Sequence, residues 1–86
     1  MTEPSIDPDA AEALRTGSPA PVRLLLTCAA DVEPVVVQLG TTRMAVVDRI
    51  ADLGILVVEA TEDDLGVLAT LDGVLSVELD GEERAL

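Results

Sequence analysis

The sequence contains no phenylalanine, tyrosine or tryptophan, so aliphatic side chains must form any core. Each buried branched aliphatic side chain contributes only about 1.5–3 kcal/mol. A chain of 86 residues also buries a smaller fraction of its surface than a longer chain does. We therefore expect one small domain of modest stability, which a bound partner would stabilise by mass action.

Histidine is also absent, and cysteine occurs once, at Cys28. Without histidine the chain lacks the usual general base near neutral pH. The serines Ser5, Ser18 and Ser76 have no base partner for hydrolase chemistry, and the isolated glycines form no phosphate-binding loop. The sequence therefore predicts no enzyme, no catalytic residue, no cofactor and no metal site, with Cys28 as a small core residue.

Positive charge is scarce, because the chain has 5 arginines and no lysine against 17 acidic residues, and its net charge is −12. Such a surface repels nucleic-acid phosphates and anionic lipids, so we expect no nucleic acid and no membrane among the partners. No apolar stretch reaches the roughly 18–20 residues of a membrane span. The N-terminus shows no basic region followed by an apolar run, so we expect no secretory signal and a cytoplasmic location.

Composition divides the chain into three parts. Residues 1–20 combine prolines with acids, and we predict a disordered acidic tail there. Residues 21–80 hold the apolar patterns of a folded domain, and residues 81–86 are predicted as a flexible C-terminal tail.

Three segments have the length and residue types of β-strands: Val22–Cys28, Ile55–Ala60 and Val74–Leu79. Apolar residues at Val32, Val35, Val36 and Leu39 have helical spacing, and Gly40 follows as a stop. A second helix is expected to begin at Thr61, because three acids occupy its first turn, where the helix dipole favours negative charge.

The segment between Thr41 and Leu53 allows two interpretations. As a helix it would be amphipathic, and periodicity alone favours this interpretation. The corresponding layout is β-β-α-β-α-β, with a strand at Val35–Leu39 and a helix at Thr42–Leu53. As a strand and turn, Arg43–Arg49 would pair with Ile55–Ala60 in a hairpin.

A four-stranded sheet with two helices on one side leaves its other side, here called the open face, uncovered. Side-chain alternation along the strands predicts an apolar group on this face with two acids at its rim. These residues are Leu25, Ile55, Val57 and Val74, with Glu59 and Glu78 at the rim. Such a patch usually marks a partner interface; alternatively, a helix or the tail covers it, or two copies pair through it.

The stretch TEDDLGVLATLDGVLSVELDGEERAL resembles the second half of subtilisin-type propeptides and of their free-standing inhibitor relatives. That family has an acidic helix start, spaced leucines, a Gly-Val turn into the last strand and a Val-Glu-x-Asp signature. The matching residues are Leu65, Leu68, Leu71, Gly73, Val74, Val77, Glu78 and Asp80. Upstream, VRLLLT resembles the family's first strand, and QLG resembles the end of its first helix.

The resemblance implies an α+β fold, namely a ferredoxin-like β-α-β-β-α-β sandwich that has an antiparallel sheet with two helices on one face. It makes residues 32–39 the first helix and favours the hairpin of Arg43–Arg49 with Ile55–Ala60 over the helical interpretation.

The resemblance also implies a propeptide-like inhibitor or folding chaperone of a subtilisin-type serine protease. The open face would dock on two surface helices of the protease, and Glu78 and Asp80 would cap the N-termini of those helices. The C-terminal tail would lie in the substrate groove as a product mimic. Its contact residues would be Glu83, Arg84, Ala85 and Leu86, although family tails commonly have a small or apolar residue at the position of Glu83. The alternative is a protein-interaction module, forming a hetero- or homodimer through the open face, with no protease target.

Overall fold

A computed structural model describes residues 4–15 and 21–79 of the chain. The strands are β1 (Ser5–Ile6), β2 (Val22–Cys28), β3 (Ala45–Ile50), β4 (Ile55–Ala60) and β5 (Val74–Leu79). The helices are α1 (Pro8–Arg15), α2 (Glu33–Leu39) and α3 (Leu65–Leu68), with short 3-10 turns η1 (Ala51–Leu53) and η2 (Glu62–Asp64).

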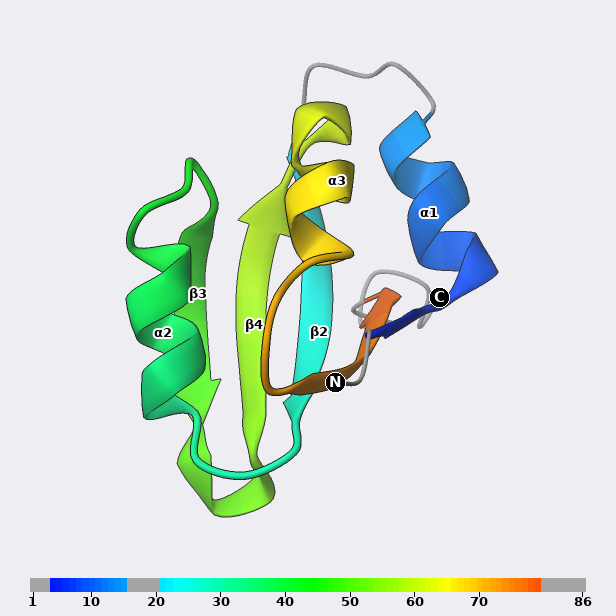
Figure 1. Ribbon diagram of the computed structural model, residues 1–86. Coiled ribbons are helices and arrows are strands. Elements are labelled where there is room, and N and C mark those ends of the chain that lie inside the picture. The colour runs from blue at the N-terminus through cyan, green and yellow to red at the C-terminus, as the bar shows by residue number, and fades with distance from the viewer. Residues whose placement is uncertain (1–3, 16–20, 80–86) are drawn as a thin grey trace.

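The strands form one five-stranded sheet in the order β1-β5-β2-β4-β3 (Figure 1). The strand β2 lies between β4 and β5 and is antiparallel to both. The strand β3 pairs antiparallel with β4, and β1 pairs parallel with β5. The two outermost strands are therefore β1 and β3, and the sheet is mixed.

All three helices lie on the same side of the sheet (Figure 1). Their buried residues join the inward-facing residues of the strands in a single hydrophobic cluster. Leu24 and Leu26 of β2, Leu56 and Val58 of β4 and Val77 of β5 are fully buried in it. The core is aliphatic throughout, as the lack of aromatic residues requires.

The helix α2 buries Val35 and Leu39, so the helical spacing predicted for this segment is confirmed. Gln38, the residue before Leu39, links α2 to the loop before β5. The Gln38 amide nitrogen donates to the Asp72 carbonyl at 2.7 Å, and the Asp72 N–H donates to the Gln38 side-chain oxygen at 2.9 Å. The two bonds together hold α2 against the chain that leads into the last strand.

The ambiguous segment forms a strand, so the hairpin interpretation is confirmed and the helical one is wrong. The strand β3 pairs with β4 from Ala45 to Ile50, and Gly54 closes the turn with φ 68°, a conformation that glycine adopts without steric cost. On the helix side of the sheet, Arg49 forms an ion pair with Glu33 of α2. The hydrophobic periodicity of this segment favoured a helix because its pairing with β4 shifts register between Val46 and Asp48. The shift breaks the two-residue alternation expected of a strand.

The prediction of a disordered tail over residues 1–20 does not hold for residues 4–15. Ser5 and Ile6 pair with Ser76 and Val77, and α1 follows directly. The helix buries Ala10 and Leu14, so even this polar segment supplies apolar side chains to the core.

The architecture is α+β, as predicted, but its details differ from the expected four-stranded antiparallel sheet with two helices. The described chain has five strands and three helices, because β1 and α1 add to the edge formed by β5. The predicted C-terminal tail, residues 81–86, lies outside the described residues.

Replacement of Leu14 by alanine tests whether α1 belongs to the core. Leu14 is 2% exposed, so Leu14→Ala should lower the free energy of unfolding by about 2–5 kcal/mol. Glu12→Ala on the exposed side of α1 is the matched control and should change it by less than about 0.5 kcal/mol. Chemical denaturation followed by far-ultraviolet circular dichroism measures both; equal stabilities would show that α1 does not pack.

Replacement of Gln38 by glutamate tests the link between α2 and the loop before β5. A carboxylate can accept the Asp72 N–H but cannot donate to the Asp72 carbonyl, so we expect a loss of about 1 kcal/mol. Val37→Ala on the same helix is the control, because Val37 is 69% exposed. The same denaturation experiment applies, and a Gln38→Glu variant as stable as the control would contradict the role of the two bonds.

Candidate functional site

The candidate site is the open face of the sheet, the side that carries none of the three described helices. Side chains from neighbouring strands lie across it in rows, because paired residues point to the same side. The middle row runs from Asp48 through Val57 and Leu25 to Glu78, as the paired positions on β3, β4, β2 and β5 show. The apolar pair Val57 and Leu25, here called the apolar centre, is therefore flanked by one carboxylate at each end.

The next row, on the side of the β3–β4 turn, is apolar where it crosses β3 and β4. Ile50 pairs with Ile55, and Ile55 pairs with Thr27 of the central strand. Ile50 is 37% exposed and Ile55 is half-buried. The two isoleucines extend the apolar centre toward the β3–β4 end of the open face.

The row on the other side is polar. Arg23 and Glu59 face each other across β2 and β4 with a nitrogen–oxygen distance of 3.5 Å. Both side chains are about two-fifths exposed, so this ion pair contributes little to stability and mainly lines the rim of the apolar centre.

The residues of the middle row differ in how much of their surface is exposed. Val57 is 7% exposed although it belongs to no part of the core cluster, because β4 is an inner strand and its neighbours in the row shield it. Leu25 is half-buried and Glu78 is exposed. A partner would therefore contact more of Leu25 than of Val57, between the exposed carboxylates of Asp48 and Glu78.

The structure brings together four of the residues predicted for partner binding, namely Leu25, Ile55, Val57 and Glu78, on one face. The prediction for Val74 is wrong, since Val74 pairs with Cys28 and is buried in the core cluster. The register between β2 and β5 shifts at this point, which moves Val74 to the helix side. The predicted contacts Asp80, Glu83, Arg84, Ala85 and Leu86 lie outside the described residues.

Sequence reasoning missed the open-face residues of β3, among them Asp48 and Ile50. Both lie on β3, the segment whose pattern predicts a helix as readily as a strand. Once the hairpin is accepted, pairing with Ile55 identifies Ile50, but the register shift at Val47 hides Asp48.

The described residues offer little for covalent or metal chemistry. They contain no group of three or more acidic or cysteine side chains placed to hold a metal ion. Cys28 is 7% exposed, and burial raises the pKa of its thiol, which disfavours the reactive thiolate.

No helix among the described residues is long and apolar enough to cross a membrane. The sequence matches no protein-family profile, and neither a curated protein nor a solved structure matches it significantly.

The raised pKa of Cys28 predicts a loss of stability at alkaline pH. The contribution of the protonated thiol is fully present below the ordinary pKa of a cysteine thiol and is lost as the pH rises through the higher pKa of the folded state. The chain has no histidine, tyrosine or lysine, so few other groups titrate in this range.

Unfolding free energies of the parent and Cys28→Ala at neutral and alkaline pH measure this effect. We expect the parent to lose stability above the ordinary thiol pKa, and the variant to lose less. An equal loss in both proteins would contradict the assignment to Cys28.

Proposed function

We propose that this chain binds another protein through the open face, as a propeptide-like inhibitor or folding chaperone of a subtilisin-type serine protease. The observation that carries the binding proposal is the middle row of the open face. There Val57 and Leu25 lie between Asp48 and Glu78 with no described helix above them. Apolar surface with a charged rim is typical of interaction sites.

The proposal includes a ferredoxin-like core for residues 22–79. The strand order β5-β2-β4-β3, together with helices in the two crossover connections and a hairpin between β3 and β4, supports this assignment. In this interpretation β1 and α1 are an N-terminal addition beside β5. The connectivity agrees with the resemblance to subtilisin-type propeptides, which have this fold.

Docking would use the apolar centre and the acids in different ways. Leu25, Val57 and Ile55 would contact apolar side chains of the partner. Glu78 and Asp80 would receive N–H groups at helix N-termini of the protease, where a carboxylate is stabilised. The tail from Gly81 to Leu86 would then enter the substrate groove.

The charges on the open face favour a different protein over a second copy as the partner. Asp48 and Glu78 carry negative charge at both ends of the middle row, and the whole chain has a net charge of −12. Two copies face to face would bring like charges together, which destabilises association.

Inhibition of a subtilisin-type protease tests the proposal. Leu25→Asp should raise the inhibition constant about ten-fold or more, because a carboxylate replaces an apolar contact at the centre of the interface. Deletion of Arg84–Leu86 should abolish inhibition, because it removes the residues assigned to the substrate groove. Val37→Asp on the helix side is the control and should leave inhibition unchanged.

Failure of the unaltered chain to slow cleavage by any subtilisin-type protease would reject the protease as partner. Inhibition that survives the deletion would reject tail insertion alone. A stable dimer in sedimentation experiments, disrupted by Leu25→Asp, would favour the homodimer instead.

A further inference from the structure

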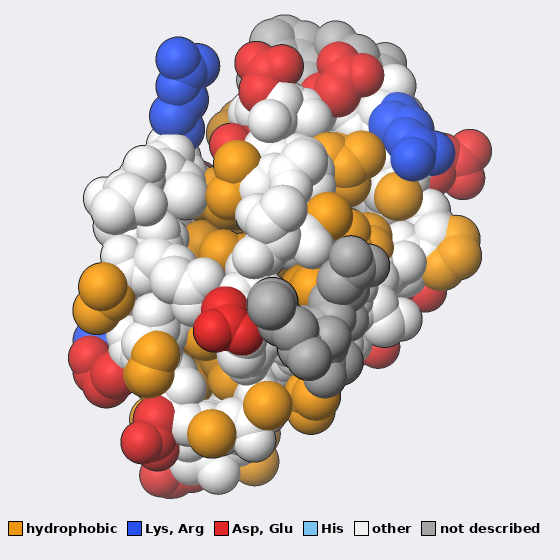
Figure 2. Space-filling model, in the orientation of Figure 1, with side chains coloured by type: hydrophobic (Ala, Val, Ile, Leu, Met, Phe, Trp, Pro, Cys, Tyr) orange, Lys and Arg blue, Asp and Glu red, His pale blue; other side chains and the backbone are white. Residues whose placement is uncertain are grey.

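A pocket of about 540 Å³ opens on the helix-bearing side, between the loop that follows α2 and the start of α3. Six residues line it: Thr41, Thr42, Arg43, Asp63, Asp64 and Val67. Figure 2 shows a basic side chain above the loop after α2 and acidic side chains over the end where α3 begins. The pocket therefore has a positive side and a negative side.

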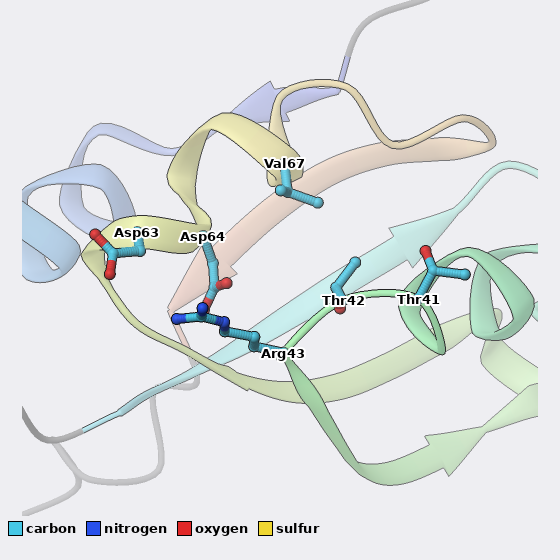
Figure 3. A pocket seen from close by; sticks show the side chains of 6 residues that line it. All are labelled: Thr41, Thr42, Arg43, Asp63, Asp64 and Val67. Atoms are coloured by element: carbon cyan, nitrogen blue, oxygen red, sulfur yellow. The ribbon is translucent and has the colours of Figure 1, made fainter.

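The positive side is Arg43. Its side chain is exposed and extends toward Asp64 in Figure 3. Arg23 and Arg49 each have a carboxylate partner, whereas Arg43 has none within ion-pair distance among the described residues. A guanidinium with free donors is well suited to bind a carboxylate through two parallel hydrogen bonds.

The negative side consists of Asp63 and Asp64. Asp64 is 7% exposed, and one of its oxygens, Oδ2, accepts the Thr61 N–H at 2.8 Å and the Thr61 hydroxyl at 3.3 Å. Its other oxygen, Oδ1, has no hydrogen-bond partner among the described residues. Asp63 is exposed and also lines the pocket, but its carboxylate points away from Asp64 in Figure 3. Oδ1 of Asp64 is therefore the oxygen that a bound ammonium group would meet.

We propose that this pocket binds a small zwitterion, an amino acid or short peptide that carries both a carboxylate and an ammonium group. Arg43 holds the carboxylate, and Asp64 holds the ammonium. Val67, which is 37% exposed, contacts an aliphatic side chain of the ligand. The volume lies within the range of about 300–1,000 Å³ found for small-ligand sites.

The pocket and the open face lie on opposite sides of the sheet. A ligand in the pocket would leave the open face uncovered, so this proposal does not depend on the proposed docking to a protease. It assigns the chain a second binding capacity, for a small molecule.

Titration of the ¹⁵N-labelled full chain with L-valine tests the proposal by amide chemical shifts. We expect shifts at residues 41–43 and 63–67. N-acetyl-L-valine lacks the ammonium and L-valinamide lacks the carboxylate, so each should bind about ten-fold more weakly, because each loses a charge-assisted contact. Glycyl-L-valine has its two charges further apart than L-valine has. A comparison of the two therefore shows whether the pocket prefers a short peptide or a free amino acid, and a preference for either ligand supports the proposal.

Variants assign the two ends of the ligand. Arg43→Gln should weaken L-valine about ten-fold and leave L-valinamide unchanged, since valinamide has no carboxylate for Arg43 to bind. Asp64→Asn keeps an oxygen for the Thr61 N–H but removes the negative charge, so it should weaken L-valine and leave N-acetyl-L-valine unchanged. Arg15→Gln and Glu12→Gln on α1 are matched controls that should alter nothing.

Three results would overturn the proposal. One is the absence of shifts at these amides with either zwitterion. Another is equal binding of L-valine, its amide and its N-acetyl form. The third combines two observations: the parent binds neither zwitterion, and Arg43→Gln shifts the amide signals of Asp63 and Asp64 in the absence of ligand. Arg43 would then form an internal ion pair that fills the pocket.

Discussion

The alternation of side chains along β2 connects the core of this protein to its open face. Leu24 and Leu26 are fully buried under the helices, while Leu25 between them points to the opposite side. A shift of one residue in the pairing of β2 would exchange these two sets. The aliphatic core therefore determines which side chains the open face presents, and both depend on the register that β4 and β5 impose on the central strand.

The inner strands could be predicted from the sequence because their signals are local. Runs of β-branched and leucine residues between turn residues predict Val22–Cys28, Ile55–Ala60 and Val74–Leu79, and β2, β4 and β5 have these bounds. The edge strand β3 could not be separated from a helix by pattern, because its register shift interrupts the alternation. Pairing with β4 decides its structure, and pairing is a tertiary property.

The residues of the open face were predicted correctly where side-chain alternation along the strands is regular, and wrongly where it is interrupted. Leu25, Ile55 and Val57 share the face because β2 and β4 pair without interruption. Val74 was misplaced by the shift near Cys28, a feature that depends on how two strands meet. The role of α1 could not be predicted either, since only two of its residues, Ala10 and Leu14, are buried in the core, and their packing depends on the other elements.

The two edges of the sheet present different obstacles to pairing with another chain. At one edge, β1 occupies the side of β5 at Ser76 and Val77, so another chain cannot pair there. At the other edge, β3 is exposed over most of its length, but it carries Asp48 and Arg49 and an interrupted register. Charged side chains and bulges discourage the addition of a further strand. Both features therefore oppose open-ended sheet growth in a chain rich in valine and leucine, even though the edge at β3 is uncovered.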